Sequence, residues 1–256
     1  MRILRLTNSM DTRDDVADEK RIPAIVDRIL SDAIGEPCTT VSRLMWPSPK
    51  LPGSVEQWME EDRPDVVFIK IGAYPYVYHL VAAQMERQWP AFLRPLAEGA
   101  RSLSYKKWFV ENPLMWPAKQ LSRKIVGRST YFEPEEVVQV LETVIRRVVR
   151  REDCTLVVRG PFLPIYLDPR LRAWADARSA VVDTALARIC AALHVDYISG
   201  AGGLADADEV ALRLPDVMHY TEEGHRYHGE KEAGYILEAW RRFHGVDSTA
   251  AGSARG

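Results

Sequence analysis

The sequence has few cysteines, only three among 256 residues. Cys38, Cys154 and Cys190 are odd in number and lie inside apolar segments, a pattern typical of buried, reduced thiols in a cytoplasmic protein. None has CxxC spacing or a histidine nearby in the sequence. This argues against a cysteine-ligated metal site and against a cysteine nucleophile.

The chain also lacks a strong charge bias and any long apolar run. Its formal net charge is −2, so no long-range attraction to nucleic acid or to an anionic membrane is expected. No apolar run approaches the length needed to span a bilayer. The opening residues MRILRLTNS already resemble a strand and a turn, and Arg5 breaks their apolar stretch, so a signal peptide is not expected. These absences favour a cytoplasmic location and leave the oligomeric state open.

What the sequence does contain is an alternation of short apolar runs with longer segments of helical period. This alternation is typical of a parallel sheet covered by helices. The length is enough for one domain with a full core and an insertion, which we place over about residues 1–244. The predicted strands are Arg2–Leu6, Thr39–Leu44, Asp65–Ile71, Cys154–Arg159 and Val195–Ile198.

Helical patterns fill the intervals between these strands. The first helix has apolar residues on one face and ends at Gly35, a residue suited to a helix C-terminus. Pro134 stands near the first turn of the third helix. The predicted helices cover about residues 22–35, 54–61, 134–148, 171–193 and 221–243. A tail rich in Gly, Ser and Ala over 245–256 is expected to be disordered.

One stretch, over about residues 88–130, breaks the alternation. It is too long for a simple connection between strand and helix, and it predicts an inserted helical subdomain or lid. Between Arg101 and Arg128 it carries seven Lys and Arg residues against one acidic residue, Glu111, with Tyr, Trp and Phe interleaved. This composition fits either a solvated basic face or a lid that contacts an acyl chain with its aromatics and an anionic group with its cations.

Two polar segments stand where a parallel sheet places its ligand crevice. Ser9 follows the first predicted strand, and the carboxyl ends of parallel strands form that crevice. A serine there can attack a carbonyl and donate its backbone N–H to the oxyanion, or it can simply occupy an ordinary turn. Asp216 precedes His219 by three residues just before the last helix. The carboxylate can orient one ring nitrogen while the other faces a nucleophile, or Asp216 can cap a turn beside a surface histidine.

The joint occurrence of these segments resembles the SGNH (GDSL-like) hydrolase superfamily. The C-terminal block, with Asp216, His219, Gly224 and His225, is the more specific part, and the N-terminal block keeps Ser9 but has Thr7-Asn8 in place of Gly-Asp. The similarity covers both ends of the chain and the strand–helix alternation between them. It implies a catalytic triad of Ser9, His219 and Asp216.

The resemblance also implies an oxyanion hole. Beside the backbone of Ser9, the family's glycine block corresponds to Gly53, whose N–H would approach the oxyanion closely. The family's asparagine after the third strand is replaced by Tyr74. Either Tyr74 donates through its hydroxyl, or Asn8 takes the role, or the backbone N–H groups of Ser9 and Gly53 act alone.

Further residues are weaker candidates for contact with the substrate. Tyr76 and His79 follow the third strand and could line an acyl pocket or pack as ordinary aromatics. Arg159, at the end of the fourth predicted strand, could bind a substrate oxygen or pair with an acidic neighbour. His225 and His228 follow His219, but no cysteine or carboxylate pattern supports a metal site.

We therefore expect a three-layer α/β/α sandwich with a flavodoxin-like, five-stranded parallel sheet and a helical insertion. The expected activity is hydrolysis of a small-molecule carboxylic ester through an acyl-Ser9 intermediate, without a metal or organic cofactor. Two alternatives remain open at the level of the sequence. One is an acyltransferase that moves an acyl group from an ester or thioester to a hydroxyl of a sugar or other metabolite, and the other is a catalytically inactive ligand-binding protein of the same fold.

Overall fold

The computed structural model describes residues 1–8, 16–77, 130–162, 169–200, 211–214 and 219–245. The chain divides into two compact units, one formed by Met1–Ala73 with Pro134–Gly256 and the other by Tyr74–Glu133. The second unit contains a short described helix, α3 (Tyr74–Val77). The predicted lid over about 88–130 and the predicted tail from residue 246 onward lie almost wholly outside the described residues.

The first unit is built on a five-stranded sheet with the order β2-β1-β3-β4-β5. All neighbouring strands are parallel. This is the flavodoxin-like order that the sequence predicts, with β1 at the point where the chain reverses direction across the sheet. The strands are β1 (Arg2–Thr7), β2 (Thr39–Leu44), β3 (Val66–Gly72), β4 (Thr155–Phe162) and β5 (Asp196–Ile198).

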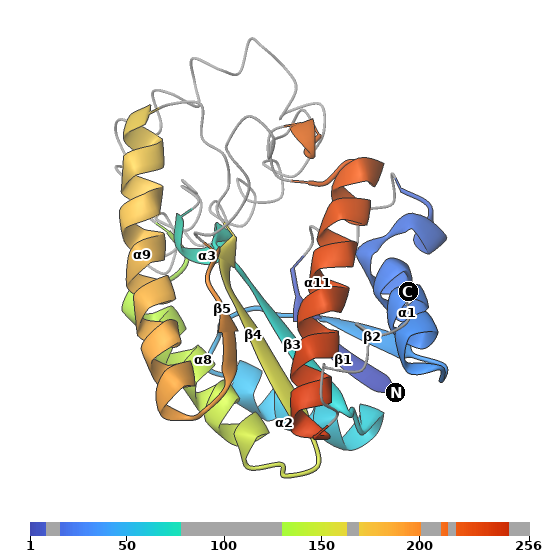
Figure 1. Cartoon of the computed structure of the whole chain (residues 1–256). Coiled ribbons are helices and arrows are strands. Elements are labelled where there is room, and N and C mark those ends of the chain that lie inside the picture. Colours follow the sequence, from blue (N-terminus) through green and yellow to red (C-terminus); the bar gives the residue numbers. More distant parts are fainter. Residues whose placement is uncertain (9–15, 78–129, 163–168, 201–210, 215–218, 246–256) are drawn as a thin grey trace, which may run out of the picture. The chain divides into compact units, whose positions relative to one another are not determined.

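Helices cover both faces of this sheet (Figure 1). On one face α1 (Ile22–Ile34) packs beside α11 (Glu222–Phe243), and α11 also contacts β3 and β4. On the other face α8 (Pro134–Val149) packs between α2 (Leu51–Asp62) and α9 (Pro169–Ala192). A short 3-10 helix, η2 (Asp18–Lys20), precedes α1. The predicted three-layer α/β/α sandwich is therefore confirmed.

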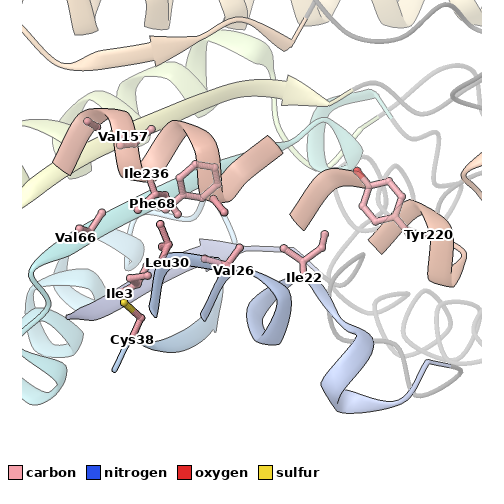
Figure 2. Close-up of a cluster of buried hydrophobic side chains, with 12 residues drawn as sticks. Ile3, Ile22, Val26, Leu30, Cys38, Val66, Phe68, Val157, Tyr220 and Ile236 are labelled. Carbon is pink, nitrogen blue, oxygen red and sulfur yellow. The ribbon is translucent and has the colours of Figure 1, made fainter. Parts of the chain in front are cut away.

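The apolar core between the sheet and the pair α1–α11 comes from alternate residues of the strands. Ile3 on β1 is the register partner of Val66 on β3, and both are buried against α1 and α11. Successive side chains of a strand point to opposite faces, so every second residue enters this layer. Figure 2 shows Ile3, Val66 and Cys38 at one end of the buried cluster and Tyr220 at the other.

Helix α1 shows how local sequence sets an element boundary. Its buried residues are Ile22, Ile25, Val26 and Leu30, which recur at helical spacing on one face. Gly35 ends the helix with φ 78°, and its N–H donates to the Ser31 carbonyl at 2.9 Å. A left-handed residue at this position favours glycine, as the sequence predicts.

Most boundaries lie within one or two residues of those predicted, and two differ by more. Helix α2 begins at Leu51 rather than near Ser54, because Pro52 is compatible with the first turn of a helix, where its missing N–H is not needed. Strand β4 continues past Arg159 to Phe162, with an irregular register against β3 between Lys70 and Gly72. Gly53 therefore lies inside a helix, and Arg159 lies inside a strand rather than at its end. None of the helices in the described part of the chain is long and apolar enough to cross a membrane.

The three cysteines are buried and not disulfide-bonded, as predicted. Burial raises the pKa of the Cys154 thiol to about 12 and has the same effect on Cys190. Burial also raises the pKa of Cys38, and the hydrogen bond with Ser31 opposes this shift. The thiolate form, which is the nucleophile, is therefore suppressed in the native state.

We predict that the native protein resists alkylation at neutral pH. With a pKa of about 12, the thiolate fraction of Cys154 or Cys190 at pH 8 is on the order of 10⁻⁴. Iodoacetamide at pH 8 should leave these thiols unmodified until the protein unfolds, and mass spectrometry with and without urea measures this. Rapid modification of either residue in folded protein would contradict the burial described above.

Candidate active site

The end of β1 is held between its two neighbouring strands. Thr7 is fully buried, and its carbonyl accepts a hydrogen bond from the N–H of Met45 at 2.7 Å. Asn8 follows as the last described residue before Ser9. Ser9 itself lies outside the described residues. The chain leaves β1 beside the reversal point of the sheet, which is where open α/β sheets bind their ligands.

The Asn8 side chain lies against the end of β3. An ideal Cβ placed on Gly72 would be 2.2 Å from Asn8 Nδ2 and 3.1 Å from its Cγ. The amide of Asn8 thus occupies the space that any side chain at position 72 would need. Gly72 allows this close approach because it has no Cβ.

His219 is held through its carbonyl and through the two residues that follow it. Its carbonyl accepts from the Leu214 N–H at 2.8 Å, and Arg213 forms an antiparallel bridge with Tyr220. The N–H of Thr221 donates to the Leu212 carbonyl at 3.0 Å. Asp216 lies outside the described residues, between these two paired segments of the sequence.

Helix α11 begins directly after His219. Thr221 is its N-cap, and the Thr221 hydroxyl accepts a hydrogen bond from the Gly224 N–H at 3.1 Å. Glu222 and Glu223 stand in the first turn, where a negative charge interacts favourably with the helix dipole. Gly224 passes so close to Leu212 that a Cβ would lie 2.2 Å from the Leu212 carbonyl oxygen. The predicted cap is confirmed, and Gly224 is required by packing.

The remaining predicted site residues have varied surroundings. Gly53 is exposed in the first turn of α2, and a Cβ there would meet no atom within 4 Å. In the second unit, Tyr74 is half-buried with its ring centroid 6.4 Å from that of Tyr131, and Tyr76 is fully buried. His79 lies outside the described residues. The convergence of Ser9, Asp216 and His219 therefore remains a prediction.

A cluster of buried charged side chains lies between the sheet and α11. At its centre is Glu232 of α11, which is fully buried. Its Oε2 accepts from Arg5 of β1, and its Oε1 accepts from Lys70 of β3 at 3.0 Å and from Arg159 of β4 at 2.8 Å. Arg5 and Lys70 are also fully buried, and Arg159 is 9% exposed. We call these four residues the Glu232 cluster.

The charge of Arg159 is retained in this environment. Burial is the largest single influence and by itself lowers the pKa of the guanidinium. The attraction of the Glu232 carboxylate, with smaller contributions from Tyr220 and Tyr235, outweighs it and raises the pKa above its usual value. Arg159 thus pairs with an acidic neighbour, which is one of the two roles that the sequence leaves open for it.

Aromatic rings connect the Glu232 cluster to the residue next to His219. Lys70 Nζ lies 5.0 Å from the ring centroid of Tyr220, and Arg213 stacks over the same ring at 5.8 Å. The ring of His228 lies 4.4 Å from that of Tyr220, and its Nδ1 is 3.5 Å from a nitrogen of Arg159. Tyr220 is 1% exposed, so its ring is shielded from bulk solvent.

Sequence reasoning missed the Glu232 cluster. A signal was present, because Arg5 and Lys70 are charges inside apolar runs of the strands, ILRL and VVFIKI. A charged residue is almost never fully buried unless it is paired, so two such strands predict a buried partner. The sequence could not show that the partner is Glu232 on the last helix.

Among the described residues, no group of three or more His, Cys, Asp or Glu side chains is arranged to hold a metal ion. His225 and His228 are both buried on α11, in contact with Tyr220. His228 also lies beside Arg159, with Nδ1 3.5 Å from a guanidinium nitrogen.

Comparison with solved structures finds similar folds in proteins described as esterases and an acylhydrolase. The psychrotrophic esterase EstA from Pseudoalteromonas sp., in a structure inhibited by monoethylphosphonate, is 10% identical, with a TM-score of 0.52 over 94% of this chain and 98% of that one. The lipase/acylhydrolase from Enterococcus faecalis is 14% identical, with a TM-score of 0.53 over 93% and 95%. A carbohydrate acetylesterase family member from Sinorhizobium meliloti is 12% identical, with a TM-score of 0.52 over 95% and 99%.

These likenesses concern the fold and extend over almost the whole of each chain. The sequence itself matches no protein-family model and no curated protein. The fold is the three-layer α/β/α sandwich with a five-stranded parallel sheet that the sequence predicts.

We predict that the cap of α11 contributes measurably to stability. Thr221→Ala should lower the free energy of unfolding by about 1 kcal/mol, because the Gly224 N–H loses its acceptor. Thr221→Ser should retain most of the wild-type value. Urea denaturation measures the difference.

Thr143→Ala is the matched control, since Thr143 is an exposed position inside α8 whose hydroxyl only bonds back to the Gln139 carbonyl. There the same substitution should be neutral or slightly stabilising, because Ala is the better helix former. Equal effects at positions 143 and 221 would contradict the role of Thr221 as a cap.

Proposed function

We propose that the protein is a serine hydrolase acting on carboxylic esters through an acyl-Ser9 intermediate. The observation that carries the proposal is the position of Ser9 in the chain. It follows directly on β1, the strand at the reversal point of a sheet shared with esterases. The fixed backbone of His219 at the start of α11 supports the assignment of the base.

In the proposed reaction the Ser9 hydroxyl attacks the ester carbonyl while a ring nitrogen of His219 takes its proton. The tetrahedral intermediate collapses, the C–O bond to the alcohol breaks, and His219 returns the proton to the leaving alcohol. Water then attacks the acyl-Ser9 carbonyl with His219 again as the base. The bond between the acyl carbon and the Ser9 oxygen breaks, His219 returns the proton to Ser9, and the carboxylic acid leaves. Asp216 orients His219 and stabilises its protonated form. Each step is a transfer of a proton or an acyl group between this chain's residues, the substrate and water.

For the oxyanion we assign the backbone N–H groups of Ser9 and Gly53 together with the side-chain amide of Asn8. The close approach of the Asn8 amide to Gly72 favours Asn8 over Tyr74. Gly72 opens the segment in which the superfamily has its asparagine, so the Asn8 amide reaches the same end of β3 from the neighbouring strand. Donors held in place before the reaction stabilise developing negative charge without reorganisation.

We predict that Ser9→Ala abolishes ester turnover and labelling by a fluorophosphonate probe, because the nucleophilic oxygen is gone. Asp216→Asn should keep the fold but lower kcat by as much as about 10⁴, by analogy with other triads. Hydrolysis of p-nitrophenyl acetate and labelling followed by peptide mapping measure both effects. Wild-type activity in Ser9→Ala would overturn the assignment of the nucleophile.

We also predict that Asn8→Ala lowers kcat by about 10²–10³ with little change in KM, because a donor to the oxyanion is lost. Gly72→Ala should lower kcat as well, since its methyl group would take the place of the Asn8 amide. Steady-state kinetics on the same ester give both constants.

Gly234→Ala provides the control for the glycine substitution, because a Cβ at position 234 meets nothing within 4 Å. It should leave kcat unchanged. Full activity in Asn8→Ala would overturn the assignment of Asn8. A low kcat in Tyr74→Phe would then assign the donor to Tyr74, and full activity in both variants would assign the oxyanion to the backbone N–H groups alone.

A further inference from the structure

The Glu232 cluster joins three neighbouring strands to one helix through a single carboxylate. Glu232 belongs to α11, and its three partners belong to β1, β3 and β4. Both carboxylate oxygens are engaged, Oε2 by Arg5 and Oε1 by Lys70 and Arg159. The position of the carboxylate is therefore fixed in more than one direction.

Each strand partner of Glu232 is linked, by sequence or by contacts, to a segment that carries a proposed catalytic group. Arg5 is four residues before Ser9 on the strand that leads to it. Lys70 is two residues before Gly72, against which the Asn8 amide lies. Lys70 also contacts the ring of Tyr220, the residue after His219. Arg159 reaches the same ring through His228.

The energetics of such a cluster favour a role other than net stability. Burying an ion pair costs desolvation that often cancels the Coulombic gain, so apolar residues of equal volume frequently serve stability as well or better. What paired charges do impose is one geometry, because displacement by a fraction of an ångström loses hydrogen bonds in a medium of low dielectric constant. An apolar core was available at this place, since Phe68 and Val157 on the same face are fully buried.

We propose that Glu232 is a positioning residue of the ester hydrolase. It holds β1, the end of β3 and the His219–Tyr220 segment in the one arrangement that acyl transfer requires. This inference rests on the proposed function. It assigns the catalytic effect to geometry, because Glu232 is fully buried and has no access to a substrate.

The test compares Glu232→Gln with Ile236→Ala. Ile236 lies one turn further along α11 and is also fully buried, but it packs in the apolar cluster. For Glu232→Gln we expect kcat for p-nitrophenyl acetate to fall at least about tenfold with KM within about twofold, since small misplacements of reacting groups cost up to about 10² in rate. Fluorophosphonate labelling should slow by a similar factor. Ile236→Ala should lower Tm but leave both rates unchanged well below Tm.

If Glu232→Gln does not fold, a second pair of variants tests whether Glu232 acts as a positioning residue. Arg5→Met leaves Glu232 paired with Lys70 and Arg159, so the carboxylate keeps compensating charge. It should lower kcat and the labelling rate at unchanged KM, and Arg5→Lys should recover most of both by restoring a cation on β1. Recovery by Arg5→Lys supports positioning through the ion pair, because a purely structural defect would follow Tm instead.

Three outcomes separate the two claims. Absence of labelling in the wild-type protein would overturn the proposed function and this inference with it. If the wild-type protein is labelled normally, and the Glu232 and Arg5 variants have the wild-type kcat and labelling rate, this inference alone would be overturned. Loss of kcat in Ile236→Ala in proportion to its loss of Tm would also overturn it, because general destabilisation would then explain the effect.

Discussion

The buried Glu232 carboxylate is the constraint that the central strands β1, β3 and β4 have to satisfy. A carboxylate removed from water without partners costs several kcal/mol or changes its protonation state. Here its oxygens accept from three cations on three adjacent strands. The contact joins one residue of α11 to β1, β3 and β4 at once.

The face of the sheet under α1 and α11 carries both apolar and charged side chains. Toward their amino ends, alternate residues such as Ile3 and Val66 fill the apolar cluster of Figure 2. Two residues later on β1 and at the end of β3, the same alternation places Arg5 and Lys70. The apolar residues bury surface without directional preference, whereas the ion pairs of Arg5 and Lys70 require a defined direction between donor and acceptor. The two kinds of contact meet within one layer, because Phe68 is the register partner of Arg5.

The fold is shared with esterases at 10–14% identity. At such distances the layers and strand order persist while side chains change, so the chemistry must be argued from the site. The sequence differs at Thr7-Asn8 and at Tyr74 from the SGNH pattern that it resembles. The close packing of Asn8 on Gly72 offers a physical explanation for this difference. The amide at the end of β3 is supplied by Asn8, which follows the neighbouring strand β1.

The sequence by itself determined the strand–helix alternation, the end of α1 at Gly35 and the cap at Thr221. These features depend on periodicity and on contacts within a few residues, which local composition encodes. It also marked Ser9, Asp216 and His219 as candidates, although Ser9 and Asp216 lie outside the described residues. Only the tertiary structure decided that Arg159 pairs with Glu232 and that Asn8 packs on Gly72. Both contacts join residues distant in the sequence, and their existence depends on strand register and helix placement, which no local pattern specifies.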